Sequence, residues 1–311
     1  MNDEIEIVKR LTGVTDDSLI ELHDGGFSSR GYVIDKGRIV FKFPRHSDVK
    51  YDNEISILKS LNSLGLGVNL QSVGWVSDDN SYLGLYGVVG ERLCDLDLSQ
   101  TQRQSIGDQL GVFLRALHEA KIECGYRLSL DEELNGWQHR YESVLGFIKS
   151  EFSARDQEII EYLMTCHMTK TLKSLGEHLV FSHGDLDEGQ IFIDTDGKIG
   201  VIDFNEAGMF DEAADFMDVD SDELRDIMLD SYGASDELRR KVELRKDIRP
   251  IIALSAFLER GDQETASKFV QEIRRILPRY GIGNRHPSSQ PHDDLPFVGN
   301  YSMPGCEGDK P

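Results

Sequence analysis

The sequence lacks the features that mark membrane, secreted and cysteine-rich metal proteins. No run approaches the roughly 18 consecutive apolar residues that a membrane helix needs. The acidic stretch 1–6 has no apolar segment of the kind found in secretory signals. The four cysteines show no metal-ligand spacing, so we expect free thiols and a reducing cytoplasm; they are Cys94, Cys124, Cys166 and Cys306.

Positive charge is also scarce. The chain has 34 lysines and arginines against 56 aspartates and glutamates, which gives a formal net charge of −22. No basic patch interleaved with aromatic residues is present, and this argues against nucleic-acid binding. Two interpretations of the acidity stay open. It is either an ordinary solvated surface or a field that attracts a cationic small molecule.

The 311 residues suit two lobes better than one compact domain. Short β-type runs around one helical segment, 50–62, fill the first part of the chain, and helical periodicity begins near residue 100. A β-type insert interrupts the helices at 190–203. Pro250 lies inside the helical run 235–259, and we expect it to kink or split that helix.

These patterns predict an α+β fold in two lobes. We expect a small β-rich N-terminal lobe with one key helix, and a larger, mainly helical C-terminal lobe with a β-hairpin insert. The predicted ranges are 1–88 for the first lobe, 89–99 for a linker, and 100–283 for the second. Residues 284–311 are rich in Pro, Ser, Gly and Asp without periodicity, and we expect a disordered tail.

Lys42 stands in an apolar strand and shares a face with Val40, because side chains alternate along a strand. One interpretation is an edge-strand lysine that reaches water. The other is a phosphate-binding lysine held by a carboxylate, and Glu54 supplies one twelve residues later on the next helix. The loop that precedes this strand contains Gly26, Ser28 and Ser29. Its glycines would let backbone N–H groups approach phosphate oxygens, although many such loops are only turns.

The segment His183–Gln190, followed by an apolar strand and Asp203, is the most informative part of the chain. A carboxylate, a short loop, an amide five positions later and a second carboxylate after a strand are typical of a phosphoryl-transfer site. We predict that Asp185 is the catalytic base or orients the acceptor hydroxyl. Gln190 and Asp203 would offer the hard oxygen ligands that Mg²⁺ prefers. We expect His183 to be structural and to hold the loop by hydrogen bonds.

These motifs resemble the aminoglycoside phosphotransferases and their kinase-like relatives, with the pattern H-G-D-x-x-x-x-N, an apolar strand and I-D-[FW]. The likeness covers about residues 18–280, and more narrowly the sequence is similar to the branch that phosphorylates the 2″-hydroxyl of aminoglycosides. It implies a protein-kinase-like fold, Lys42 on the α- and β-phosphates, Glu54 orienting Lys42, and Mg²⁺ on Gln190 and Asp203. It also implies that Asp215 braces the lobe. Gln190 departs from the family's Asn, which puts the strength of the metal site in doubt.

The resemblance further implies ATP or GTP as the phosphoryl donor. The segment from Tyr86 to Val88 would bind the base mainly through backbone groups, so the sequence does not choose between the two nucleotides. Acidic residues are dense over 205–224. Helix N-terminal and solvated charges explain part of this density; the remainder would bind a cationic or polyhydroxylated acceptor through Glu206, Asp218 and Asp220.

The first hypothesis is therefore a Mg²⁺-dependent aminoglycoside O-phosphotransferase that confers antibiotic resistance. The second is a kinase of another hydroxylated compound, such as a macrolide, a sugar, choline or a homoserine-like metabolite. The third is a catalytically weak kinase-like binding protein, which only Gln190 favours. In each case we expect a cytoplasmic monomer that binds neither nucleic acid nor membrane.

Overall fold

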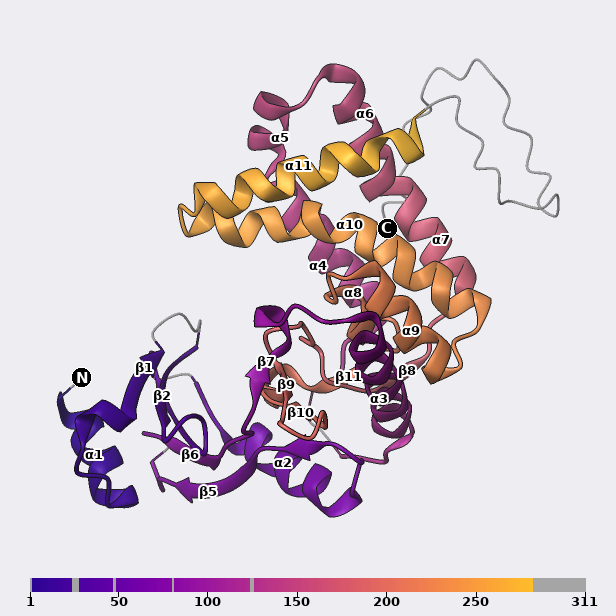
Figure 1. The fold of residues 1–311 in the computed structure, drawn as a ribbon. Coiled ribbons are helices and arrows are strands. Elements are labelled where there is room, and N and C mark those ends of the chain that lie inside the picture. Colours follow the sequence, from indigo (N-terminus) through magenta and orange to yellow (C-terminus); the bar gives the residue numbers. More distant parts are fainter. Residues whose placement is uncertain (1, 24–27, 47–48, 80, 124–125, 282–311) are drawn as a thin grey trace.

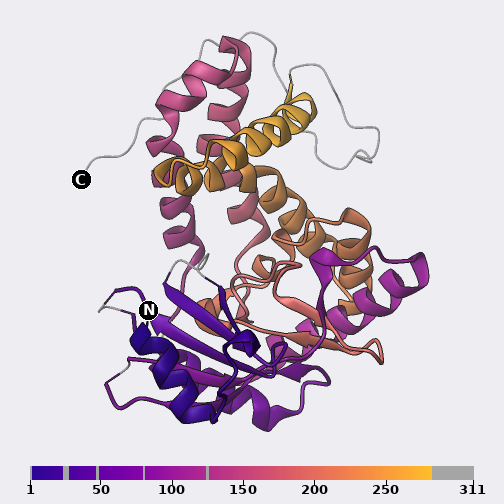
Figure 2. The ribbon, with the colours of Figure 1, turned by 60° about the vertical axis from the view of Figure 1, so that its left-hand side comes forward.

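The computed structural model describes residues 2–23, 28–46, 49–79, 81–123 and 126–281. It confirms the predicted fold class, with a small β-sheet lobe at one end and a larger helical region at the other (Figures 1 and 2). No helix in the described part of the chain is long and apolar enough to span a membrane. Cys94 and Cys166 are free thiols, as expected, while Cys124, Cys306 and the predicted tail lie outside the described residues.

The N-terminal lobe is built on a five-stranded antiparallel sheet. Its strands lie in the order β1 (Ile20–His23), β2 (Ser29–Ile34), β3 (Ile39–Pro44), β6 (Leu83–Tyr86) and β5 (Ser72–Val76). Strand β3 is central, paired with β2 on one side and β6 on the other. Lys42 therefore does not lie on an edge strand, and that alternative is wrong.

Side-chain alternation gives this sheet two different faces. One face packs against α1 (Asn2–Thr12) through an apolar cluster of Val8, Tyr32, Ile34, Phe41 and Phe43. Lys42 projects from β3 on the opposite face, where its ammonium meets the first turn of α2 (Asp52–Leu64). The alternation in the sequence therefore predicts which way this lysine points.

A second sheet joins the two halves of the chain. Its order is β4 (Asn69–Leu70), β10 (Ile199–Val201), β9 (Ile191–Ile193) and β7 (Glu91–Arg92), with β4 parallel to β10. The approach of β7 to β9 requires a glycine at residue 90. Gly90 has a φ of +152°, and a Cβ there would lie 2.5 Å from the carbonyl oxygen of Ile193. The predicted β-hairpin insert is thus part of a sheet shared with N-terminal residues.

The rest of the chain, as far as the structure describes it, is mainly helical. The helices are α3 (Gln100–Glu119), α4 (Leu130–Ser143), α5 (Leu145–Glu151), α6 (Ala154–Tyr162), α7 (Met168–Leu175), α8 (Ala214–Met217), α9 (Asp222–Tyr232), α10 (Asp236–Glu259) and α11 (Gln263–Tyr280). Short helical turns cover Asp17–Leu19, Leu93–Asp95, Leu163–His167 and Phe204–Glu206. Helix α10 runs through Pro250 without a break, so the expectation that proline splits it is wrong. Strands β8 (Leu179–Ser182) and β11 (Gly208–Asp211), which pair antiparallel, were not predicted.

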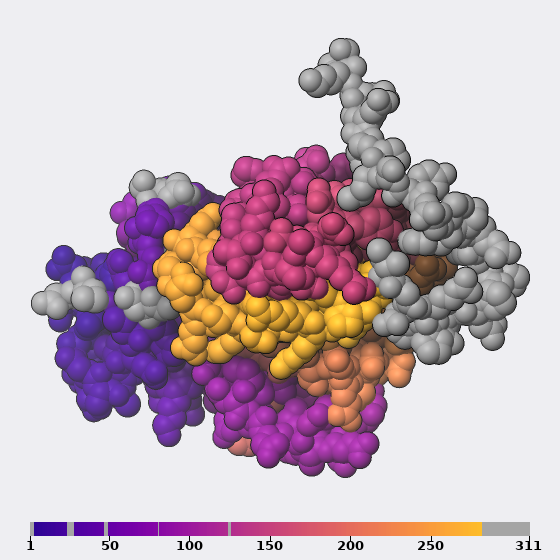
Figure 3. All heavy atoms as spheres, turned by 90° about the horizontal axis from the view of Figure 1, so that it is seen from above, coloured from indigo at the N-terminus to yellow at the C-terminus, as the bar shows by residue number. Residues whose placement is uncertain are grey.

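Two large apolar cores hold this region. The first extends from α2 and β6 to α3 and α9, so it spans both halves of the chain. Helix α3 contributes a stripe of buried side chains at helical spacing, as predicted: Ile106, Leu110, Phe113, Leu114 and Leu117. The second core gathers α4 to α7 with α10 and α11. Figure 3 shows α11 beside the segment that carries α5 and α6.

Candidate active site

The ammonium group of Lys42 bridges two carboxylates from distant parts of the chain. Its Nζ atom donates to Oε1 of Glu54 at 2.6 Å and to Oδ1 of Asp203 at 2.8 Å. Glu54 is 1% exposed, and Lys42 is 15% exposed. Burial by itself would lower the pKa of Lys42, but the charges of the two carboxylates outweigh it and raise that pKa above the ordinary value. Lys42 is therefore held as a cation.

Asp203 lies two residues after the end of β10 and has a left-handed backbone, with a φ of +67°. This conformation is uncommon for a residue other than glycine and occurs often at functional sites. Its N–H donates to Oε1 of the buried Gln71 at 3.1 Å. Burial alone would raise the pKa of Asp203, but the charge and hydrogen bond of Lys42 reverse the effect and lower it. The carboxylate is thus kept ionised.

The turn at His183 and Gly184 is fixed by buried hydrogen bonds. The backbone N–H groups of His183 and Gly184 each donate to a different carboxylate oxygen of Asp215 at 2.9 Å. The His183 ring is buried, with Nε2 2.9 Å from the carbonyl oxygen of Ile202. Gly184 has a φ of +84°, and a Cβ there would lie 2.6 Å from the carbonyl oxygen of Glu206. The expected structural roles of His183 and Asp215 are confirmed.

Asp185 follows this turn and is exposed. The side-chain amide of Gln190 forms hydrogen bonds with two residues of the 185–190 loop, Asp185 and Asp187. Its Nε2 donates to Oδ2 of Asp185 at 3.1 Å, and its Oε1 accepts from the N–H of Asp187 at 3.0 Å. The N–H of Ile202 donates to the carbonyl oxygen of Gln190 at 3.1 Å, which ties the loop to the residue before Asp203.

Asp185 lies among other acidic groups. Partial desolvation first, and then the negative charges of Asp218, Asp187 and Asp203, raise the pKa of Asp185 to about 7. The hydrogen bond from Gln190 acts in the opposite direction. The structure thus brings the two carboxylates of the sequence motif, Asp185 and Asp203, within electrostatic reach of each other.

The structure describes four of the other residues predicted to bind the donor, Ser28, Ser29, Tyr86 and Val88. Ser29 Oγ is 2.9 Å from the hydroxyl of Tyr51, and the carbonyl oxygen of Ser28 accepts from the N–H of Arg45 at 2.9 Å. Gly26 lies outside the described residues. At the end of β6, Tyr86 is 51% exposed, whereas the side chain of Val88 is buried.

The three residues predicted to bind the acceptor differ in their surroundings. Glu206 is exposed and accepts from Nδ2 of Asn205 at 3.0 Å. Asp218 and Asp220 both face the guanidinium of Arg249, a residue for which the sequence carries no signal because it lies about 30 positions away on α10. Two of the three predicted carboxylates are therefore already paired within the chain.

The residues predicted to hold a magnesium ion are Asp203 and Gln190, of which Oδ1 and Oε1 already accept hydrogen bonds from Lys42 and from the N–H of Asp187. Among the described residues no group of three or more His, Cys, Asp or Glu side chains is arranged to hold a metal. A site completed by nucleotide phosphates needs fewer protein ligands, because Mg²⁺ commonly keeps waters and takes one or two carboxylates. In addition, Oε2 of Glu54 is buried without a hydrogen-bond partner beside Lys42. The hard oxygens present fit a magnesium ion bound together with phosphates.

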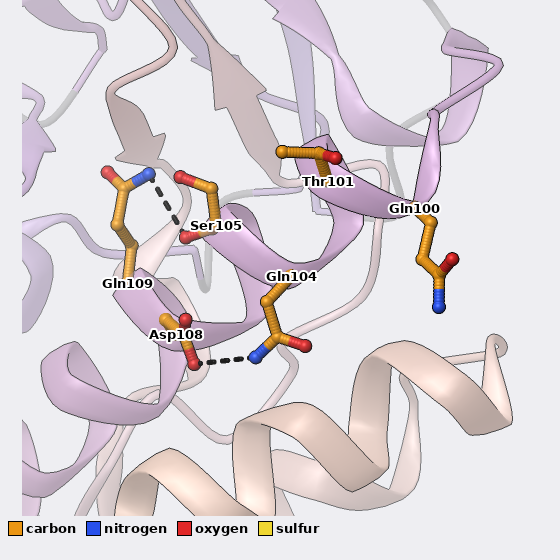
Figure 4. Close-up of a pocket in the computed structure, with 6 residues that line it drawn as sticks. All are labelled: Gln100, Thr101, Gln104, Ser105, Asp108 and Gln109. Atoms are coloured by element: carbon orange, nitrogen blue, oxygen red, sulfur yellow. Dashed lines mark hydrogen bonds between the residues drawn. The ribbon is translucent and has the colours of Figure 1, made fainter.

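Figure 4 shows a separate, open recess on the surface of α3. It is lined by Gln100, Thr101, Gln104, Ser105, Asp108 and Gln109. The Gln109 amide donates to the carbonyl oxygen of Gly197 at 3.0 Å and accepts from the N–H of Ile199 at 3.2 Å, so it braces the β9–β10 hairpin. These side chains provide hydrogen bonds but no constellation suited to phosphoryl transfer.

Comparison with known proteins agrees with this geometry. The sequence profile of a phosphotransferase enzyme family, APH, matches residues 20–244. No curated protein matches the sequence. The solved structure of the GDP and kanamycin complex of APH(2″)-IIIa is similar, with a TM-score of 0.74, 19% identity, and coverage of 90% of this chain and 99% of that one.

Two further structures share the fold. The streptomycin–ATP ternary complex of APH(2″)-IIa has a TM-score of 0.64 and 18% identity, and covers 88% of this chain and 95% of that one. The macrolide 2′-phosphotransferase MphH from Brachybacterium faecium has a TM-score of 0.60 and 17% identity, with coverage of 87% and 98%. The chain has the fold of these kinase-like phosphotransferases. It belongs to the phosphotransferase enzyme family whose profile it matches.

Proposed function

We propose that this protein transfers the γ-phosphoryl group of ATP or GTP to a hydroxyl group of a small molecule, with an aminoglycoside as the first candidate. The observation that carries the proposal is the bridge from Lys42 to Glu54 and Asp203. It places a fixed cation and a strand-end carboxylate beside the Asp185 loop. Phosphoryl transfer depends mainly on such positioning and charge stabilisation.

Lys42 would bind the α- and β-phosphates of the donor. Its ammonium already lies between two carboxylates, and Glu54 is buried, so Glu54 keeps the lysine in place when the phosphates replace Asp203 as its partner. Asp203 and Gln190 would hold a magnesium ion, which neutralises charge on the phosphates when it is bound. The segment Tyr86–Val88, with Gly26, Ser28 and Ser29, would contact the rest of the nucleotide.

Asp185 would orient the acceptor hydroxyl and accept its proton at a carboxylate oxygen. The amide of Gln190 holds Oδ2 of this carboxylate at 3.1 Å, which leaves Oδ1 for the hydroxyl. A positioned base of this kind typically contributes about 10²- to 10⁴-fold in rate. Because the pKa of Asp185 is raised to about 7, the side chain has the basicity that a proton acceptor needs near neutral pH.

Support for an aminoglycoside comes from two observations. The structures with the highest similarity named above hold kanamycin or streptomycin. The acidic residues Glu206, Asp218 and Asp220 would contact a cationic acceptor, the last two after it displaces Arg249. The similarity to a macrolide phosphotransferase favours a second candidate, a kinase of another hydroxylated compound such as a macrolide, sugar or choline. Both candidates use the same catalytic residues.

The test is nucleoside diphosphate release with ATP and GTP, measured over a panel of acceptors at fixed Mg²⁺. Turnover with kanamycin-type compounds supports the first proposal, and turnover only with macrolides, sugars or choline supports the second. Nucleotide binding without turnover on any acceptor would contradict both and leave a kinase-like binding protein. Asp185→Asn is the matched control, since it should bind nucleotide and lose most turnover.

A further inference from the structure

The segment from Asp215 to Asp222 runs alongside the Asp185 loop. At its start, Asp215 accepts the backbone N–H groups of His183 and Gly184. Toward its end, the N–H of Ser221 donates to Oε1 of Glu188 at 3.0 Å. Asp218 lies between these anchors, one helical turn after Asp215 and therefore on the same face. These contacts place the Asp218 carboxylate against the loop that carries the catalytic residue.

Three of the four acidic residues of this segment, Asp218, Asp220 and Asp222, are paired with cations from α9 or α10. Nε of Arg249 contacts Oδ1 of Asp218, and Nη1 of Arg249 lies 3.4 Å from Oδ1 of Asp220. Asp222 contacts both Arg225 and Lys246. The negative charges of these three carboxylates are therefore partly balanced within the chain.

The pair between Arg249 and Asp218 is shielded from water. Their side chains are 25% and 15% exposed, whereas Asp220 is 80% exposed. An exposed ion pair is worth little, but a shielded pair costs free energy to break because both charges lose a partner. An ammonium group of an acceptor that binds Asp218 must first displace this guanidinium.

We propose that Arg249 determines acceptor specificity by acting as an internal competitor for Asp218. The competition weakens the binding of acceptors that need an ammonium group at this carboxylate and favours acceptors recognised through hydroxyl groups. This inference rests on the proposed function, because it takes the surface beside Asp185 as the acceptor site. An internal pair that is formed about nine-tenths of the time lowers apparent affinity by about tenfold.

The test compares Arg249→Gln with the wild type in direct binding titrations without nucleotide. The probes are kanamycin and fully N-acetylated kanamycin, which keeps the carbon skeleton but lacks the ammonium charges. We expect Arg249→Gln to bind kanamycin about tenfold more tightly than the wild type and to leave the affinity for the acetylated compound unchanged. The control is Arg239→Gln, on the same helix, which removes an ion pair with Asp230 and should change neither affinity.

The double variant Asp218→Asn/Arg249→Gln provides a second check, since it should lose the gain in kanamycin affinity. Equal or weaker binding of kanamycin by Arg249→Gln, including no binding by either protein, would overturn the proposal, provided that thermal unfolding shows both proteins folded. Tighter binding by Arg249→Gln without turnover on any acceptor would uphold the proposal on specificity and contradict the proposed function. The two failures are therefore distinguishable.

Discussion

Nε2 of His118 lies 3.0 Å from Oδ2 of Asp215, and both side chains are buried beneath the turn that precedes Asp185. The same carboxylate accepts hydrogen bonds from the N–H groups of His183 and Gly184. Helices α3 and α8 and the Asp185 loop therefore meet at the side chain of Asp215. The shape of the loop depends on this carboxylate.

Asp215→Asn should destabilise the protein by about 3 kcal/mol, because an amide turns one acceptor oxygen into a donor facing backbone N–H groups. The measurement is urea unfolding at pH 7. Burial by itself would raise the pKa of Asp215, but the hydrogen bond and charge of His118, with other contacts, lower it. The folded state then binds fewer protons than the unfolded state.

The stabilising contribution of Asp215 should therefore be complete above the ordinary carboxyl pKa of about 4 and should decrease as pH falls below it. The difference in free energy of unfolding between the wild type and Asp215→Asn, followed from pH 7 to pH 3, reports this loss. A difference that stays constant over that range would contradict the assignment.

Lys42→Ala should lower kcat/KM for the nucleotide by about 10²- to 10³-fold, because it removes the only charge in the Glu54–Lys42–Asp203 bridge that binds phosphate. Steady-state kinetics with varied ATP or GTP measures the effect. Lys59→Ala, an exposed lysine on α2, is the control and should behave as the wild type. Unchanged kinetics for Lys42→Ala would remove this residue from nucleotide binding.

Asp185→Asn should reduce kcat by about 10²- to 10⁴-fold while nucleotide affinity stays within a few-fold of the wild type. The physical reason is that an amide can still hold the hydroxyl but accepts no proton. The exposed Asp196→Asn in the β9–β10 turn serves as the control. A kcat near that of the wild type would exclude Asp185 as the proton acceptor.

Gln190→Ala should raise the Mg²⁺ concentration for half-maximal turnover by about tenfold or more, because it removes one proposed ligand and the hydrogen bonds that position Asp185. Gln190→Asn keeps a carbonyl oxygen and should retain most of the metal affinity. A titration of turnover with Mg²⁺ at saturating nucleotide distinguishes the variants. Equal Mg²⁺ dependence in all three proteins would show that Gln190 is no ligand.

The sequence predicts those features that depend on local pattern. Alternation in 39–43 gives the orientation of Lys42, and helical spacing gives the buried face of α3, since both follow from backbone geometry. The motif spacing predicts that Asp203 lies close to the Asp185 loop. The reason is that β9 and β10 form a short antiparallel hairpin, so the end of β10 lies next to the start of β9.

Local sequence patterns do not predict contacts between residues that are far apart in the chain. Gln71 at the N–H of Asp203 and Arg249 at Asp218 belong to elements far away in sequence, and no spacing rule connects them. The strands β8 and β11 are short and separated by the whole motif, so each alone resembles a loop. For the same reason the number of acidic residues over 205–224 is a poor guide to local charge, since partners such as Arg249 and Lys246 come from α10.

The sheet that unites β4, β7, β9 and β10 has a consequence for the chain as a whole. Backbone hydrogen bonds join residues 69–70 and 91–92 to the strands at 191–201. Each half of the chain therefore has strand edges that only the other half pairs. Fragments divided just before α3 would each expose unpaired strand edges and part of the shared apolar core. Such fragments should recover a native structure only when they are mixed.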